Sequence, residues 1–223
     1  MTQRPKSASA TTDTGGPTVL VVEDDESARR ALGNLFQSVG LEVQLFGSAS
    51  DMLRSRIPAT ASCLVLDVRL PGLSGLDFQT ELAKANINIP IIFMSGHGDI
   101  PMTVRAMKGG AVDFLTKPFR DQDMLDAVGA AIERDRKRRE TEKIVSDLQA
   151  RFETLTPRER EIFAFVSSGL MNKQIAAELG LAEITVKIHR GRITRKMGAK
   201  SLAELVRQAE ALGICRNKAQ SVR

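Results

Sequence analysis

The sequence lacks an apolar run of about 18 residues, the length that spans a bilayer, so no membrane association is expected. Residues 1–17 are rich in Ser, Thr and Ala and lack the apolar core that a secretory signal needs. We therefore expect residues 1–17 to form a disordered tail and the protein to reside in the cytoplasm.

Cysteine and histidine are both scarce. The two cysteines, Cys63 and Cys215, lie far apart and make neither a disulfide framework nor a zinc site. The two histidines, His97 and His189, are too few for a His-based metal site. These counts predict two structural thiols in a reducing cytoplasm.

Charge is divided unevenly along the chain. Residues 1–150 carry 18 Lys and Arg against 20 Asp and Glu, whereas residues 151–223 carry 14 against 7. A compact basic segment is typical of nucleic-acid binding. A solvated basic surface explains the same count, so charge alone leaves both interpretations open.

Short apolar runs alternate with helical periodicity in the first half of the chain. The runs that predict strands are residues 19–22, 42–46, 63–66, 89–94 and 112–115. Helical spacing lies between them and from residue 120 onward. Five strands separated by helices predict an α/β doubly wound fold, with a five-stranded parallel sheet covered on both faces.

The second half reads as helical throughout. Residues 131–153 have mixed charge and predict a helical linker, whose apolar stripe also fits a weaker role as a dimer contact. Thr156 and Ser201 each open a predicted capping box, and Asn172 is a predicted N-cap, so these three residues predict helix starts. Gly180 and Gly198 predict helix ends.

Four short helices in this region predict a small all-α domain. The segments expected are a disordered tail (1–17), the α/β domain (18–130), the helical linker (131–153), the all-α domain (154–213) and a flexible tail (214–223).

Polar residues mark the carboxyl ends of the predicted strands. Glu23 and Asp24 follow the first strand, Asp67 ends the third, Ser95 follows the fourth and Lys117 the fifth. On a doubly wound sheet these ends meet at one edge. Three clustered carboxylates are costly unless a cation neutralises them, and hard oxygen ligands suit Mg²⁺ better than zinc. Each of these residues, taken alone, is also explained by a purely structural role as a helix cap, a turn residue or a surface residue.

Four segments resemble the receiver domain of bacterial response regulators, a flavodoxin-like fold. They are Val21-Val22-Glu23-Asp24-Asp25, Leu66-Asp67-Val68-Arg69-Leu70-Pro71-Gly72, Phe93-Met94-Ser95-Gly96-His97 and Asp113-Phe114-Leu115-Thr116-Lys117-Pro118-Phe119. The resemblance covers residues 18–130. It implies that Asp67 accepts a phosphoryl group from a sensor histidine kinase.

The same resemblance implies roles for the neighbouring residues. Ser95 and Lys117 would contact the phosphoryl group, and Ser95 and Phe114 would act as the switch. The ligands implied for Mg²⁺ are Glu23, Asp24, Asp67 and the backbone carbonyl of Arg69.

Residues 172–197 have the form of a helix-turn-helix, with Gly180 in the tight turn. On the second helix, Val186, Ile193 and Met197 share a face that is expected to pack on the core. The residues expected on the opposite, outer face are Lys187, Ile188, Gly191, Arg192 and Arg195.

An isoleucine on this basic outer face fits apolar contact with a thymine methyl group, and Lys187 and Arg192 fit contact with base edges or phosphates. Asn172, Lys173 and Thr185 lie near helix N-termini, where phosphate contact is favourable. A helical bundle that docks protein is the alternative.

Residues 155–205 resemble the DNA-binding domain of FixJ/NarL-type (LuxR-like) regulators. The segments that carry the match are Leu155-Thr156-Pro157-Arg158-Glu159-Arg160-Glu161, Asn172-Lys173-Gln174-Ile175-Ala176 and Thr185-Val186-Lys187-Ile188-His189. Two residues depart from the pattern. Ala182 replaces a capping Ser, which predicts a weaker helix start, and Gly191 replaces a base-reading side chain, a role that Arg192 is then expected to take.

These observations predict a two-component transcriptional regulator that is not an enzyme, is phosphorylated on Asp67 and binds double-stranded DNA. Expected partners are the kinase, RNA polymerase and, when phosphorylated, a second copy in a homodimer. Two alternatives remain open: a Mg²⁺-dependent hydrolase with Asp67 as nucleophile, and an adaptor whose helical domain binds protein.

Overall fold

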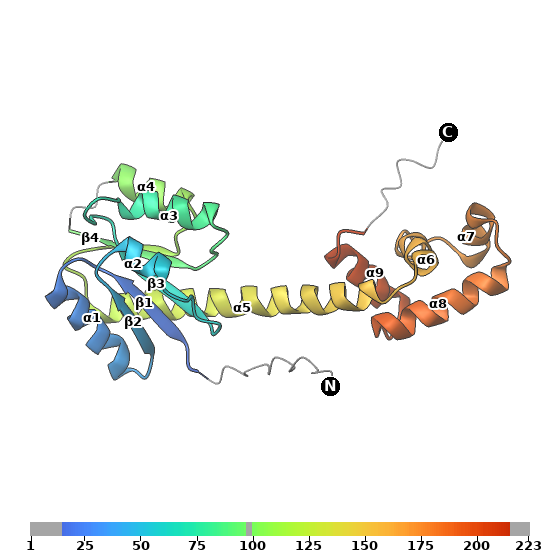
Figure 1. Cartoon of the computed structure of the whole chain (residues 1–223), viewed down its shortest axis with the longest axis horizontal. Helices are drawn as coiled ribbons and strands as arrows, with labels where there is room; N and C mark the ends of the chain where they lie inside the picture. The colour runs from blue at the N-terminus through green and yellow to red at the C-terminus, as the bar shows by residue number, and fades with distance from the viewer. Residues whose placement is uncertain (1–14, 97–99, 215–223) are drawn as a thin grey trace, which may run out of the picture. The chain divides into compact units, whose positions relative to one another are not determined.

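The computed structural model describes residues 15–96 and 100–214, which form two compact units divided after Arg139 (Figure 1). Most of the two predicted tails, together with His97 and Cys215, lies outside the described residues. Within these ranges no helix is both long and apolar enough to cross a membrane.

The first unit is built on one parallel sheet. Its strands are β1 (Thr18–Val22), β2 (Glu42–Phe46), β3 (Ser62–Asp67), β4 (Ile91–Ser95) and β5 (Asp113–Thr116). Their order in the sheet is β2-β1-β3-β4-β5, and all neighbours pair in parallel. The predicted five-stranded doubly wound sheet is therefore confirmed, and every carboxyl end lies at one edge.

Helices cover both faces of this sheet (Figure 1). They are α1 (Glu26–Ser38), α2 (Ala49–Arg54), α3 (Gly75–Lys84), α4 (Ile100–Lys108) and α5 (Asp121–Glu153). Alternate residues of β1 serve the two faces: Leu20 packs in a core with α2, α3 and α4, and Val21 in a core with α1 and α5. The period-2 alternation of strand side chains explains why nearly every strand position is apolar.

The fourth strand differs from its predicted bounds of 89–94. It begins at Ile91, directly after Pro90, which has no N–H to donate to a sheet ladder. It ends at Ser95, which was expected to follow it. Ser95 is thereby a fully buried strand residue rather than a loop residue.

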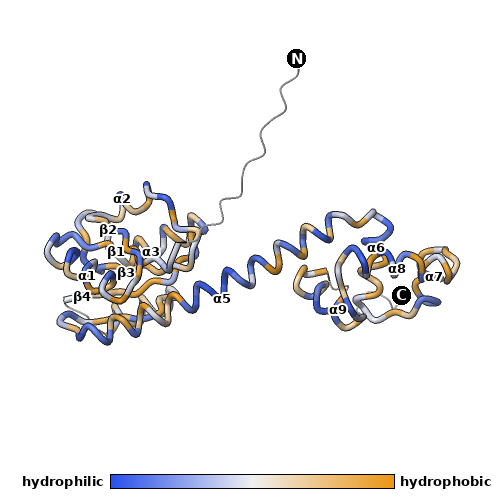
Figure 2. Tube along the Cα trace, turned by 90° about the horizontal axis from the view of Figure 1, so that it is seen from below, coloured by the Kyte–Doolittle hydropathy of each residue, from blue (hydrophilic) through white to orange (hydrophobic). Residues whose placement is uncertain are grey.

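The helix α5 is 33 residues long and contains the whole of residues 131–153; its middle is hydrophilic (Figure 2). Asp135 is nonetheless 0% exposed. Its carboxylate accepts hydrogen bonds from Ser62 N–H (2.9 Å), Arg138 (2.6 Å) and Arg139 Nε (2.6 Å). Arg139 also donates to the carbonyls of residues 58 and 59. These bonds hold α5 on the start of β3 and explain why the first unit continues to Arg139.

Cys63 lies next to this cluster and is 0% exposed. Burial, assisted by the negative charge of Asp135, raises the pKa of its thiol to about 12. A thiol in this state is a poor nucleophile, as expected of a structural cysteine.

In the second unit, described as far as residue 214, four short helices follow the end of α5. They are α6 (Pro157–Ser167), α7 (Asn172–Leu179), α8 (Glu183–Met197) and α9 (Leu202–Ala211). Val186, Ile193 and Met197 are at most 1% exposed and lie in one core with Ile162 and Phe163. The predicted all-α fold and the predicted inner face of α8 are both confirmed.

Two of the predicted caps are wrong in detail. Asn172 is the first residue of α7 rather than its cap, because Met171 holds the cap position and its N–H donates to Gln174 Oε1 (2.9 Å). Ser201 does cap α9, but Glu204 accepts from Lys200 N–H (2.7 Å) instead of completing a capping box.

The capping box at the start of α6 contains a buried carboxylate. Glu159 is 2% exposed and accepts from Thr156 N–H (2.9 Å) and from Lys196 Nζ (2.6 Å). Burial acts to raise the pKa of Glu159, but the bonds from Lys196 and Thr156 outweigh it and the pKa lies below its ordinary value. The ionised form therefore stabilises the helical unit.

We expect this stabilisation to depend on pH. A carboxyl group whose folded pKa is lowered contributes stability above its unfolded pKa, about 4.3, and loses it as pH falls through the folded pKa. In thermal unfolding of the second unit, Glu159→Gln should be less stable than the wild type at neutral pH, and the difference should shrink below about pH 4. The exposed Glu178→Gln is the control; a pH-independent difference for Glu159→Gln would contradict the assignment.

Candidate functional site

Three carboxylates meet at the carboxyl edge of the sheet. Glu23 and Asp24 follow β1, and Asp67 is the last residue of β3, which is the neighbour of β1. A ligating oxygen from each of the three lies within 4.8 Å of the other two. Glu23 and Asp67 are buried, at 2% and 6% exposed, and Asp24 faces solvent.

Two cations lie at this cluster: Lys117, and Arg29, whose Nη1 donates to the backbone carbonyls of Glu23 (2.6 Å) and Asp24 (3.1 Å). Lys117 Nζ donates to Glu23 Oε2 and to Asp67 Oδ2, both at 2.6 Å. Its backbone N–H donates to the carbonyl of Ser95 (2.8 Å), which fixes the loop after β5 against the end of β4. The ammonium thus lies between the two buried carboxylates.

Burial and the neighbouring charges both influence the pKa values of Glu23 and Lys117. Desolvation is the largest influence on Glu23 and, together with the charge of Asp67, raises its pKa despite the bond from Lys117. Burial acts to lower the pKa of Lys117, but its bonds to Asp67 and Glu23 raise it overall. Lys117 pairs with two of the three carboxylates, and three acidic oxygens this close together fit a divalent cation bound by oxygen.

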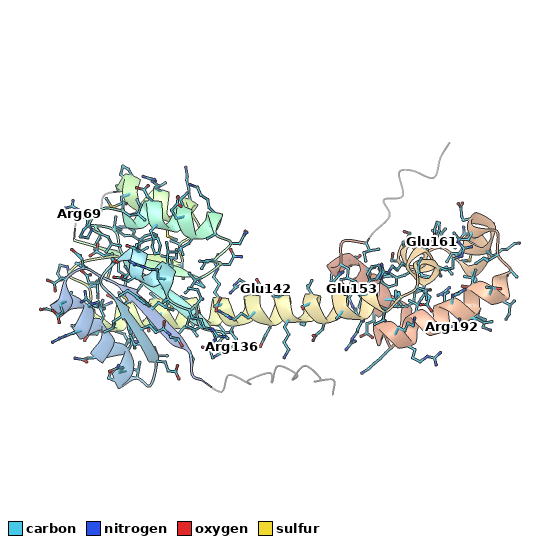
Figure 3. All side chains as sticks on the ribbon, viewed as in Figure 1. Arg69, Arg136, Glu142, Glu153, Glu161 and Arg192 are labelled. Atoms are coloured by element: carbon cyan, nitrogen blue, oxygen red, sulfur yellow. The ribbon has the colours of Figure 1, made fainter. Side chains whose placement is uncertain are left out.

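The loop after β3 shapes the rest of the site. Arg69, labelled in Figure 3, donates its backbone N–H to Asp67 Oδ1 (2.7 Å). Gly75 opens α3 directly against this loop, since a Cβ at Gly75 would lie 2.4 Å from the carbonyl oxygen of Asp67. Gly75 was not among the predicted site residues, and only its position before a helical run could have drawn attention to it.

Ser95 and Phe114 lie on the neighbouring strands β4 and β5. Ser95 is 0% exposed at the end of β4. Phe114 is half-buried on β5 and packs near Phe93, with 6.3 Å between ring centroids. The two residues expected to form the switch therefore belong to adjacent strands, but Phe114 pairs with Phe93, two positions before Ser95.

The outer face of α8 is basic with an apolar element. Lys187, Ile188, Arg192 and Arg195 are all exposed; Figure 3 labels Arg192. Lys173 is exposed near the start of α7, and Thr185 is half-buried in the first turn of α8. The structure thus places the expected cations of α8 on the side of the helix away from the core.

Asn172 is arranged differently from the other predicted contacts. Its Oδ1 accepts a short hydrogen bond from Arg190, which ties the start of α7 to α8. Its observed contact is therefore within the protein. Arg190 was not among the predicted site residues, and no sequence signal separates it from the neighbouring cations.

The start of α8 is weakly capped, as expected. Ala182 holds the N-cap position in extended backbone and makes no side-chain cap bond. We expect Ala182→Ser to stabilise the helical unit by about 0.5–2 kcal/mol, because a hydroxyl there accepts a bond from a free N–H of the first turn. Calorimetry of the full chain measures this change.

Ala177→Ser is the matched control for this experiment. Ala177 is exposed within α7, so serine there removes helix propensity without offering a cap and should destabilise slightly. Equal changes in both variants would show that the Ala182 effect is not capping.

The two units define a class of protein. A doubly wound sheet with three carboxylates and a lysine at its carboxyl edge is accompanied by a four-helix unit whose helix-turn-helix exposes cations. This combination is that of a signal-receiving domain joined to a DNA-binding domain.

Comparison with known proteins identifies the family. Residues 19–129 match the response regulator receiver domain, and residues 153–209 match the luxR family of bacterial regulatory proteins. The chain belongs to the response regulators that join these two domains and act as transcriptional regulators. The expected membership and fold class are confirmed, and the adaptor alternative gains no support.

Individual relatives cover nearly the whole chain. Nodulation protein W of Bradyrhizobium diazoefficiens is 70% identical over 89% of this chain and 88% of its own. The transcriptional regulatory protein FixJ of Azorhizobium caulinodans is 41% identical over 88% and 93%. The solved structure of the response regulator StyR is 49% identical, covers 87% of this chain and 98% of its own, and has a TM-score of 0.77.

Proposed function

We propose that Asp67 is the phosphoacceptor of this regulator. The observation that carries the proposal is the position of Asp67 at the end of β3, where its carboxylate lies near those of Glu23 and Asp24 and accepts a bond from the ammonium of Lys117. In the transfer, a carboxylate oxygen of Asp67 forms the new P–O bond as the P–N bond of the kinase phosphohistidine breaks. Such a transfer needs mainly position and charge neutralisation.

Glu23, Asp24 and Asp67 would hold Mg²⁺, together with the backbone carbonyl of Arg69. When bound, the ion supplies the positive charge that offsets the phosphoryl oxygens. Lys117, already bonded to Asp67, stays in place to pair with the product. The hydroxyl of Ser95 binds a phosphoryl oxygen, which draws Ser95 and its loop inward. Phe114 then changes rotamer into the space that this movement leaves.

The outer face of α8 binds double-stranded DNA in this proposal. Lys187, Ile188, Arg192 and Arg195 enter the major groove, while Lys173 and Thr185 contact phosphates at helix N-termini. Asn172 supports this surface through Arg190 and reaches the backbone of DNA only if that bond opens.

We infer a division into a receiver domain (18–130), a helical linker (131–153) and a DNA-binding domain (154–213), with tails at 1–17 and 214–223. Phosphorylation favours a homodimer on two half-sites, and RNA polymerase is the next partner on the promoter. The protein acts in the cytoplasm, where its DNA lies. It has no enzymatic substrate in this scheme, because the hydrolase alternative needs an external phosphate ester and a second acid or base.

The test is selection of duplexes from a random-sequence pool, with and without acetyl phosphate and Mg²⁺. We expect one motif to be enriched, more strongly after phosphorylation, with the added mass located on Asp67. Phosphorylation without enrichment would remove DNA from the proposal, and turnover of an added phosphate ester would favour the hydrolase.

A further inference from the structure

Four residues form a line along the outermost side of α8. At 3.6 residues per turn, positions 184, 188, 191 and 195 fall on one line opposite the buried positions 186, 193 and 197. The first three are Ile184, Ile188 and Gly191, so the N-terminal part of the line is apolar. Ile184 was not among the predicted contacts, although its spacing of four residues from Ile188 is visible in the sequence.

Both isoleucines are unusually accessible. Ile184 is 62% exposed and Ile188 is 51% exposed. Lys187 and Arg192 flank the line on its two sides, and among the described residues neither is engaged in an ion pair with the protein. Ile184 and Ile188 therefore form an apolar strip between two cations that can pair with anions outside the chain. Such a strip is complementary to a surface that is apolar in the middle and anionic at its borders.

Gly191 continues this line one turn beyond Ile188. It lies in the interior of α8 with ordinary helical backbone, and a Cβ there would meet no atom within 4 Å. Nothing in the described chain therefore requires glycine at this position, although glycine inside a helix is less favourable than alanine. On the exposed line of α8, glycine permits close approach of the helix backbone to a surface outside the chain.

We propose that Ile184, Ile188 and Gly191 form the surface of α8 that lies closest to the bases, and that the two isoleucines contact the methyl groups of two thymines. This inference rests on the proposed binding of α8 in the major groove of duplex DNA. The major groove exposes the thymine methyl between phosphate rims, which matches an apolar strip flanked by cations. Gly191 permits the approach that these short contacts need.

The spacing makes the proposal specific. Residues four apart on a helix are separated by about 6 Å along its axis. Base pairs are separated by about 3.4 Å along the DNA axis, so the two methyl groups belong to base pairs no more than about two steps apart. Each half-site is therefore expected to contain two thymines within this separation.

The test removes single methyl groups from the DNA and from the protein together. In the duplex selected from the random pool, each thymine is replaced in turn by deoxyuridine, which lacks only the methyl group. Two replacements should weaken binding by the full-length protein, each by about fourfold, the equivalent of one buried methyl group. With Ile184→Ala, one of these replacements should no longer matter, and with Ile188→Ala the other.

Gly191→Ala should change the stability of the protein and its binding to DNA in opposite directions. Alanine should raise the unfolding temperature of the helical unit and weaken binding to the selected duplex by at least about tenfold, because the added methyl blocks close approach. Gly129→Ala in α5 is the matched control, since a Cβ there also meets no atom within 4 Å. It should leave DNA binding unchanged.

The outcomes separate the two proposals. A selected duplex that is insensitive to every deoxyuridine, or equally sensitive in wild type and isoleucine variants, would overturn this inference and leave DNA binding intact. Unchanged DNA affinity in Gly191→Ala would overturn the assignment of close approach. Failure to enrich any duplex would overturn the proposed function as well, and would leave the strip as a surface for a protein partner.

Discussion

Asp67→Asn is expected to abolish phosphorylation by acetyl phosphate and with it the whole phosphate-dependent gain in DNA binding. The amide has no anionic oxygen to form the acyl phosphate. The fold should persist, because an asparagine Oδ1 still accepts the N–H of Arg69 and Lys117 keeps its bond to Glu23. Removing one of three clustered carboxylates also relieves like-charge repulsion. Phosphoprotein mass and duplex affinity, each with and without phosphodonor, measure the effect.

Asp25→Asn is the matched control. Asp25 is adjacent in sequence to the carboxylates, but its side chain caps α1 by accepting from Ala28 N–H (2.7 Å). Asparagine caps equally well, so phosphorylation and DNA binding should be retained. Full phosphate-dependent activation of Asp67→Asn would refute the phosphoacceptor assignment, and loss of activity in Asp25→Asn would show that the site extends further.

The sheet and its edge could be predicted from the sequence because topology does most of the positioning. Once β1, β3, β4 and β5 are recognised as parallel strands, the residues at their carboxyl ends must meet. This brings Glu23, Asp67 and Lys117 together, although they are separated by up to 94 positions in the chain. Helix boundaries in the second unit follow local chemistry, such as the left-handed backbone of Gly180 and Gly198.

Features that depend on tertiary partners could not be predicted in this way. In the sequence, Asp135 lies in a run of charged residues that predicts an exposed helix surface. It is nonetheless fully buried, because Ser62 N–H and two arginines donate hydrogen bonds to its carboxylate. Asn172 reads as a cap, but its side chain binds Arg190 from another helix. In both cases the local pattern is compatible with several partners, and only the packing of another element selects one.

The requirement for glycine at position 75 is of the same kind, and it predicts the largest loss of stability. Gly75→Ala should destabilise the receiver unit by about 1–3 kcal/mol or more, because the added Cβ would lie 2.4 Å from Asp67 O and 3.1 Å from Val68 Cα. Both are backbone atoms that cannot rotate away. The contact lies at the phosphoacceptor itself, so relief of the clash must displace α3 or the end of β3. Denaturant unfolding of the full chain, followed by circular dichroism, measures the loss.

Displacement of β3 should also slow phosphorylation at temperatures where the variant is still folded, since the Asp67 carboxylate then leaves the position that Lys117 and its partner carboxylates define. Gly129→Ala separates this effect from the general cost or gain of alanine. That position lies in a helix with open space around it, so the substitution should stabilise by about 0.5–1 kcal/mol and leave phosphorylation unchanged. If Gly75→Ala instead matched Gly129→Ala in stability and rate, the close approach of α3 to Asp67 would not exist in solution.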